Sequence, residues 1–323
     1  MKWNTKMMIT LMIASIVMVM SSTNWMSMWI GMEINMISFV PIMKMNSKES
    51  SSSTMIYFMA QSMGSSMFLY SLMSMWFLSP SGHSSLMVLL SMMIKMGMPP
   101  MHMWMINVMS STSWKCCFML MVPQKIAPLA VSSHLTNSIN EMYMLAAMAS
   151  IIGAIGGINH TSIRKIMGYS SASHLGWMLA LTMNEKWMIY MSLYAVTVMI
   201  VCYMMYYENT FYLNQISIKN KINKMALTIN MLSMGGLPPM LGFLPKWIAI
   251  QEMIDKNMII MISIMTMASL MTLMFYMNMI LPIMSLSASN NKINMHEKNY
   301  SFMIIISMMT PVALISSSWF PTY

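Results

Sequence analysis

Charged residues are scarce in this chain, which has 17 Lys or Arg and 8 Asp or Glu among 323 residues. Charged residues are thus 8% of the chain, where an average soluble domain has about 25%. Apolar residues make up 57%, and the mean hydropathy is +0.61. Too little charge is present to cover the surface of a soluble protein. The composition therefore argues against a water-soluble enzyme, a disordered chain and a secreted disulfide scaffold.

Cysteine is equally scarce. The three cysteines are Cys116, Cys117 and Cys202, which form no C-x-x-C motif. An adjacent pair and one distant residue make a poor metal or iron–sulfur site, so we expect all three to act as apolar filler.

The net charge of +9 comes from scattered basic residues. No dense basic run suits nucleic acid, and we expect no nucleic-acid partner.

Long apolar runs are what the chain does contain. About twenty such residues cross a bilayer core as a helix, whereas strands of a membrane barrel would show alternating segments of about ten. Apolar runs and polar breaks predict eleven spans, at 5–21, 25–43, 55–78, 84–98, 112–134, 142–158, 167–183, 187–208, 225–256, 258–281 and 301–319. The fold class expected is all-α, a polytopic transmembrane bundle of about 11 helices. Residues 1–323 then form a single membrane domain.

The distribution of basic residues gives an independent test of this span count. With eleven spans, the N-terminus and the loops after even-numbered spans share one side, which collects twelve of the basic residues. The opposite side has only Lys186 and Lys256. Because basic loops stay in the negative compartment, we expect the N-terminus to face that compartment and the C-terminus to face the other.

Four ionisable residues lie inside predicted spans or at their breaks: Glu33, Lys95, Lys125 and Lys246. Each charged group at the bilayer centre costs about 2.5–3.5 kcal/mol. Such residues persist when they are paired, hydrated or functional. The alternatives are that the lysines extend to the headgroups, and that Glu33 is a neutral acid with a packing role.

Two of these lysines share a sequence context. Lys95 is followed by Gly97, Pro99 and Pro100, and Lys246 follows Gly235-Gly236 and Pro238-Pro239. Paired prolines beside glycine break a helix, and the freed carbonyls need water or polar partners at depth. Interrupted apolar segments in corresponding positions of two halves are typical of transporters with inverted repeats.

This pattern suggests a first repeat over 25–134, a second over 142–256 and C-terminal helices over 258–319. The alternative is a pair of ordinary loops between short helices.

Two histidines complete the candidate proton relay. His174 lies within an apolar span, and His102 lies beside the first break. A structural hydrogen-bonding role is the alternative for each.

Six segments between about residues 25 and 250 match one family in the right order. They are Trp29–Asn35 (WIGMEIN), Lys95–Trp104 (KMGMPPMHMW), Gln124–Leu129 (QKIAPL), Gly153–Gly157 (GAIGG), His174–Met178 (HLGWM) and Gly235–Trp247. Through them the chain closely resembles the chain 2 family of NADH–ubiquinone oxidoreductases, the mitochondrially encoded antiporter-like subunits of the complex I membrane arm, in an arthropod-like version. Eleven spans resemble the shortened animal form of this family.

The resemblance implies two inverted five-helix repeats with one broken helix each, in the mitochondrial inner membrane, with the N-terminus on the matrix side and the C-terminus on the intermembrane-space side. Glu33 would pair with Lys95, and a proton path would run by Lys125 to Lys246. Other membrane-arm and accessory subunits and lipids such as cardiolipin are the implied partners. NADH, FMN, iron–sulfur clusters and ubiquinone belong to partner subunits, because this chain has no nucleotide loop, cluster ligands or evident quinone site.

Two features depart from the family's pattern. Pro123 stands two residues before Lys125 and predicts a kink in that helix. Residues 103–115 contain no acidic residue, which puts a salt bridge there in doubt. Two other functions remain open, a stand-alone cation/proton antiporter and a structural membrane subunit whose charges only hold helices in register.

Overall fold

A computed structural model describes residues 2–44, 50–77, 82–135, 139–215, 221–238 and 240–285. Within these ranges the chain is α-helical, as expected. The α-helices are α1 (Lys2–Ser21), α2 (Trp25–Lys44), α3 (Ser50–Phe77), α4 (Gly82–Met96), α5 (Met103–Ser111), α6 (Trp114–Met121), α7 (Pro123–Ser133), α8 (Ile139–Gly157), α9 (Ile163–Ala180), α10 (Trp187–Glu208), α11 (Lys221–Gly235), α12 (Phe243–Asp255) and α13 (Ile259–Ser285). Two short 3-10 helices, η2 (Thr182–Asn184) and η3 (Leu213–Gln215), flank α10.

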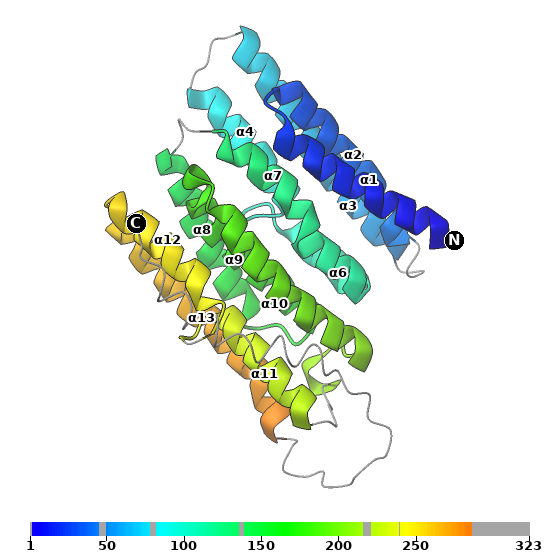
Figure 1. Cartoon of the computed structure of the whole chain (residues 1–323), viewed down its shortest axis with the longest axis vertical. Coiled ribbons are helices and arrows are strands. Elements are labelled where there is room, and N and C mark those ends of the chain that lie inside the picture. The colour runs from blue at the N-terminus through cyan, green and yellow to red at the C-terminus, as the bar shows by residue number, and fades with distance from the viewer. Residues whose placement is uncertain are drawn as a thin grey trace.

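The helices run side by side along one common direction, with α1–α3 on one flank and α11–α13 on the other (Figure 1). Four helical stretches are long and apolar enough to cross a membrane: Trp25–Lys44, Trp114–Ser133, Trp187–Glu208 and Ile259–Met284. The outward face of α13 illustrates the surface, because Ile259, Ile260 and Met267 are exposed. Apolar side chains facing outward on long helices are typical of contact with lipid.

Both helix breaks predicted at the paired prolines are present. α4 ends at Met96 and α5 begins at Met103, and α11 ends at Gly235 and α12 begins at Phe243. Gly97 and Gly236 have positive φ angles of 67° and 81°, which glycine adopts without a side-chain clash. The expected single span 225–256 is therefore two helices.

A third interruption divides the expected span 112–134. α6 ends at Met121, Val122 caps it, and Pro123 is the first residue of α7. Proline lacks the N–H that would continue the ladder and favours the first position of a new helix. The kink predicted from Pro123 is confirmed as a change of helix. Residues 99–111, which are not an apolar span, contribute α5. The predicted span 301–319 lies outside the described residues.

α8 and α9 pack closely through glycine. A Cβ atom on Gly153 would lie 2.7 Å from the backbone N of Ser173 and 2.9 Å from the carbonyl O of Tyr169. Real Cβ atoms essentially never come so close to other heavy atoms. Small residues that let two backbones approach in this way are typical of membrane helix pairs. The contact fixes the part of α9 that carries His174.

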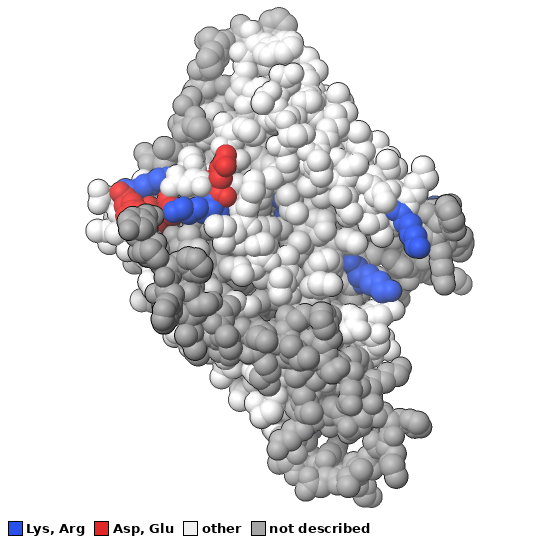
Figure 2. All heavy atoms as spheres, viewed as in Figure 1, with Lys and Arg blue, Asp and Glu red and all other residues white. Residues whose placement is uncertain are grey.

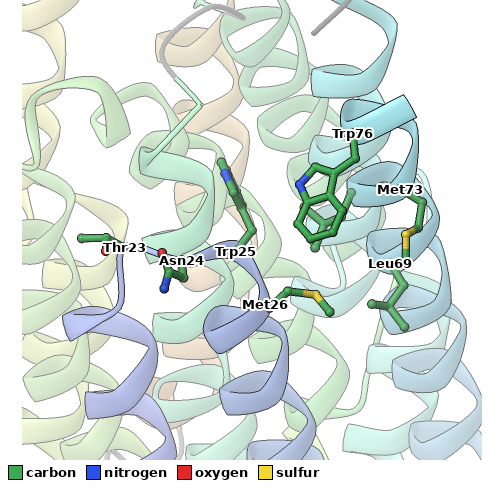
Figure 3. A pocket seen from close by; sticks show the side chains of 8 residues that line it. Thr23, Asn24, Trp25, Met26, Leu69, Met73 and Trp76 are labelled. Carbon is green, nitrogen blue, oxygen red and sulfur yellow. The ribbon is translucent and has the colours of Figure 1, made fainter. Parts of the chain in front are cut away.

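A cavity of about 390 Å³ lies between the α1–α2 turn and the end of α3 (Figure 3). Its lining residues are Thr23, Asn24, Trp25, Met26, Leu69, Leu72, Met73 and Trp76. The Trp76 side chain is 73% exposed. Tryptophans beside polar side chains at helix ends suit the interface between lipid and water.

Candidate functional site

The first pair of charged residues joins α2 to α4. Lys95 Nζ lies 3.7 Å from Glu33 Oε1. Lys95 is only 5% exposed, and Glu33 is partly buried. Lys95 therefore does not extend to the headgroups, because its charge is paired inside the bundle. Its position in the last turn of α4 also places the ammonium near the negative end of that helix.

Side chains from neighbouring helices bind the carbonyls beside the first break. Gln61 Nε2 on α3 donates to the carbonyl O of Lys95 at 3.0 Å. Trp104 Nε1 on α5 donates to the carbonyl O of Ile94, also at 3.0 Å. The last carbonyls of a helix lack donors from a following turn, and burying them unpaired would be costly. Ile94 O also accepts from the backbone N of Gly97 at 3.1 Å. The two side-chain bonds stabilise the end of α4 that carries Lys95.

A chain of neutral polar side chains leads from the Glu33 helix to the Lys125 helix. Gln124 Nε2 donates to Asn35 Oδ1 at 3.1 Å, and Tyr57 OH donates to Gln124 Oε1 at 3.1 Å. All three residues are buried. Asn35 is two residues from Glu33, and Gln124 is next to Lys125. A hydrogen-bonded connection therefore joins α2, α3 and α7 near the two charged sites.

Lys125 lies at the centre of the bundle, where it is 1% exposed. Its Nζ donates to the carbonyl O of Ser171 on α9 at 3.2 Å. The only carboxylates in ion pairs with lysine among the described residues are Glu33 and Glu252, and neither pairs with Lys125. An amine buried in the bundle without a carboxylate partner is expensive in its charged form. This cost makes Lys125 a candidate for a group that changes its charge.

His174 lies on α9, one turn beyond the carbonyl that Lys125 binds. Its Nδ1 is 2.9 Å from Tyr190 OH, and its ring centroid is 4.9 Å from that of Tyr194. It is within electrostatic range of both Lys125 and Lys246. A cavity of about 10 Å³ adjoins it, lined by His174, Tyr190, Leu193, Tyr194, Thr197, Met234, Gly242 and Pro245. That volume suits about one water molecule.

Lys246 lies at the second break, on α12, and is 6% exposed. Its Nζ donates to the carbonyl O of Gly235 at 2.7 Å, at the end of α11. This lysine is also buried and does not extend to the headgroups. The structure therefore places Lys125, His174 and Lys246 in one buried region.

His102, the sixth candidate, has a different environment. It caps the start of α5, where its Nδ1 is 3.2 Å from the carbonyl O of Pro100. Its ring lies edge-on against Tyr169, with centroids 5.7 Å apart. These contacts stabilise the first break, and none of them reaches the three lysines.

Comparisons with known proteins show the family to which this chain belongs. The family model described as NADH:quinone oxidoreductase/Mrp antiporter, TM, matches residues 22–84 and 81–272. NADH-ubiquinone oxidoreductase chain 2 of Locusta migratoria is 40% identical over 316 residues, which cover 93% of this chain and 92% of the relative. The chain 2 protein of Anopheles gambiae is 37% identical, with 92% of each chain covered. The chain belongs to the NADH-ubiquinone oxidoreductase chain 2 family.

A solved structure supports the same fold for this chain 2 family member. A chain from respiratory complex I of Thermus thermophilus, with bound aureothin, aligns with a TM-score of 0.79 at 15% identity. The alignment covers 97% of this chain and 77% of that chain. At this level of identity the likeness shows the fold alone.

Sequence reasoning missed several residues of this chain 2 site. Asn35, Tyr57 and Gln124 form its polar connection, yet neutral polar residues are common in spans and cost little there. A usable signal existed for Asn35, which is two residues from Glu33, and for Gln124, which is next to Lys125, but not for Tyr57. Glu252 was also missed, because it falls near the end of a predicted span. It is 5% exposed and accepts hydrogen bonds from Asn184 and Lys186.

Proposed function

We propose that this chain is a proton-translocating membrane subunit of mitochondrial respiratory complex I. Its relatives carry the name NADH-ubiquinone oxidoreductase chain 2, and the matching family model joins these oxidoreductases to Mrp antiporters. The observation that carries the proposal is the buried series Glu33, Lys95, Lys125 and Lys246. Each of the three lysines is at least nine-tenths buried within the bundle. Ionisable side chains are costly to bury in a membrane, and they are typical of proteins that move protons or ions along a path.

The chain's own residues would move protons in steps. A coupling event in a neighbouring subunit changes the distance between Glu33 and Lys95. Without the nearby carboxylate the Lys95 ammonium is less stabilised, which favours release of its proton. The proton passes by Lys125 and His174 toward Lys246 and leaves on one side. Electron transfer from NADH through FMN and iron–sulfur clusters to ubiquinone takes place in partner subunits.

The proposed location is the mitochondrial inner membrane. The N-terminus faces the matrix and the C-terminus the intermembrane space, in accordance with the distribution of basic residues. The partners are other membrane-arm and accessory subunits, together with lipids such as cardiolipin along the exposed apolar faces. The two repeats span residues 25–134 and 142–256, and each contains a broken helix with a buried lysine.

The test replaces one member of the ion pair in the assembled complex. Lys95→Met removes a titratable group at the first break, and Glu33→Gln removes its partner. Either substitution is expected to reduce proton translocation per assembled complex by at least about tenfold, as loss of a proton-transfer group does. Lys115→Met is the matched control, because Lys115 is exposed and lies over the ring of Tyr206 outside the buried series. Undiminished translocation by both variants would refute the proposal.

A stand-alone cation/proton antiporter is the second candidate, since the family model includes Mrp antiporters. It predicts cation-driven proton exchange by the purified single chain in lipid vesicles. A complex I subunit predicts no exchange by the single chain and activity only in the assembled complex.

A further inference from the structure

A charged cluster lies at one end of the second half, and the proton path proposed above does not use it. It contains Glu141, Glu185, Lys186, Glu252, Asp255 and Lys256. These are four of the eight acidic residues of the chain, and the cluster has a formal charge of −2 while the chain has +9. Figure 2 shows acidic and basic side chains gathered on the flank where α12 lies in Figure 1. Negative charge is therefore concentrated at this end.

Glu252 is the buried member of the cluster. It lies near the end of α12 and is 5% exposed. Lys186 Nζ forms an ion pair with its Oε1, and Asn184 Nδ2 donates to its Oε2. The Lys186 side chain is 47% exposed. One ion pair thus connects a buried carboxylate directly to the solvent.

A second buried polar group, the Tyr143 hydroxyl, lies near Glu252. The Tyr143 side chain on α8 is 1% exposed, and its hydroxyl has no hydrogen-bond partner among the described residues. This phenol is within electrostatic range of Glu252, and Lys256 Nζ lies 5.8 Å from its ring centroid. Glu141 Oε2, two residues earlier on α8, is likewise buried and without a partner. Buried polar atoms of this kind are usually satisfied by ordered water.

Glu252 and Lys246 share the buried face of α12, which also includes Pro245, Ala249 and Met253. Six positions separate them, which is a rise of about 9 Å between their Cα atoms along the helix. The Lys246 head binds the carbonyl O of Gly235, and no ion pair joins it to Glu252 among the described residues, so a proton that passes between them needs water as a carrier. Facing Glu252 from the elements around it are Lys186 and Tyr143. The adjoining ends of α9 and α13 present no titratable side chain.

We propose that Glu252 is the port through which Lys246 exchanges protons with the solvent at this end of the molecule. The proton leaves Lys246 Nζ as the ammonium becomes a neutral amine, and water passes it to the Glu252 carboxylate. The protonated Glu252 then releases it to solvent beside Lys186 and returns to the carboxylate. The negative cluster raises the local proton concentration and so assists this exchange.

This inference rests on the proposed function, and the test separates the two. Whole complex I carrying Glu252→Gln is reconstituted in vesicles, and proton translocation is followed with a pH-sensitive dye. Glutamine still accepts from Asn184 but does not titrate. Proton translocation per assembled complex is expected to fall at least about tenfold and to recover substantially in Glu252→Asp, which keeps a titratable group. Glu208→Gln, which replaces an acid at the end of α10 outside this cluster, is the control and is expected to retain the full rate.

A purely structural ion pair predicts a different pattern. Glu252→Gln would then lower the amount and thermal stability of the complex but leave translocation per assembled complex unchanged, and Glu252→Asp would impair assembly as well. That result would overturn the proposed port. Lys246→Met tests the underlying function. If Lys246→Met stops translocation and Glu252→Gln does not, only the port is refuted. If Lys246→Met retains full translocation, the proposed function itself fails.

Should Glu252→Gln not assemble, Lys186→Met provides the second measurement. It leaves the carboxylate in place but removes its positive partner. The electrostatic environment of the carboxylate is then different, so the pH dependence of translocation is expected to change. An unchanged pH profile would contradict the port.

Discussion

Lys125 and Lys246, the two buried lysines without a carboxylate partner, each donate to a main-chain carbonyl. Ser171 O accepts from Lys125, and Gly235 O accepts from Lys246. A main-chain carbonyl accepts a hydrogen bond from either the charged or the neutral form of the amine, whereas a carboxylate strongly favours the charged form. These two lysines are therefore suited to change charge. Lys95, held by Glu33, depends on its partner to do so.

Gly236 is expected to be essential for the position of Lys246. It has a φ of 81°, and a Cβ there would lie 2.7 Å from Lys246 Nζ and 2.8 Å from its Cδ. Gly236→Ala therefore introduces backbone strain of about 1–2 kcal/mol and displaces the lysine head. We expect lower proton translocation per assembled complex. Gly235→Ala is the control, since its nearest new contact would be an ordinary 3.5 Å to Leu273. Equal effects of the two substitutions would contradict this role.

Gln124 is expected to stabilise the hydrogen-bonded connection among α2, α3 and α7. Replacing it with Met removes the acceptor of Tyr57 OH and the donor to Asn35 Oδ1. Each buried polar atom left unpaired costs about 1–3 kcal/mol. The thermal stability of the assembled complex should fall, as measured by the temperature of subunit dissociation. Gln251→Met, at a less buried position on α12, should leave it nearly unchanged, and a similar loss there would argue against a special role for Gln124.

At the scale of elements, the interruptions determine where the lysines lie. Lys95 is in the last turn of α4, Lys125 in the first turn of α7 and Lys246 in the first turn of α12. Every buried lysine of this series is thus beside a helix end. Helix ends leave backbone groups without intrahelical partners, and Lys246 binds one of them, the carbonyl O of Gly235 at the end of α11. Lys95 pairs instead with Glu33, and Lys125 binds the carbonyl O of Ser171 within α9.

The α8–α9 contact provides a prediction at this scale. Gly176→Ala would place a Cβ 2.6 Å from the carbonyl O of Ala146, a backbone atom that cannot move away alone. The two helices would have to separate, which should lower the stability of the complex by about 1–3 kcal/mol and reduce its yield. Gly168→Ala, which meets the flexible end of Met109 at 3.2 Å, is the control. Comparable yields of the two variants would refute the packing argument.

Helix positions and the main buried charges could be predicted from sequence because their physical signals are strong. Long apolar runs predicted the spans, and the cost of burial pointed to Glu33, Lys95, Lys125 and Lys246. The boundary at Val122 was predicted only as a kink, because a proline in an apolar run is compatible with either a bend or a new helix. The contacts of Asn35, Gln124 and Glu252 depend on which helices pack together, and a single sequence does not specify that.

At the scale of the whole molecule, the two ends of the bundle differ in charge. Lys115 and Lys165 lie at the start of α6 and of α9, while Lys186 and Lys256 lie at the start of α10 and the end of α12. Since successive spans alternate in direction, the two sets lie at opposite ends. The end with Lys186 and Lys256 also carries Glu141, Glu185, Glu252 and Asp255, so these six residues have a formal charge of −2. The proposed orientation places the other, more basic end on the matrix side.

Labelling from one side of the membrane tests this orientation. In sealed inner-membrane vesicles, a membrane-impermeant amine reagent is expected to modify Lys115 and Lys186 from opposite sides, because both side chains are exposed. Mass spectrometry after labelling from each side identifies the sites. Modification of both lysines from the same side would contradict the proposed topology. Lys125, which is buried, serves as the internal negative control.

The role of the buried amines is tested most directly by the number of protons translocated per electron in complex I carrying Lys125→Met. Methionine has nearly the same volume and remains apolar, so the core stays filled while the titratable group is lost. We expect the variant to assemble and its proton-to-electron ratio, or its coupled turnover, to fall sharply. A complex that assembles poorly but translocates the normal number of protons per electron would show that Lys125 only holds helices in place.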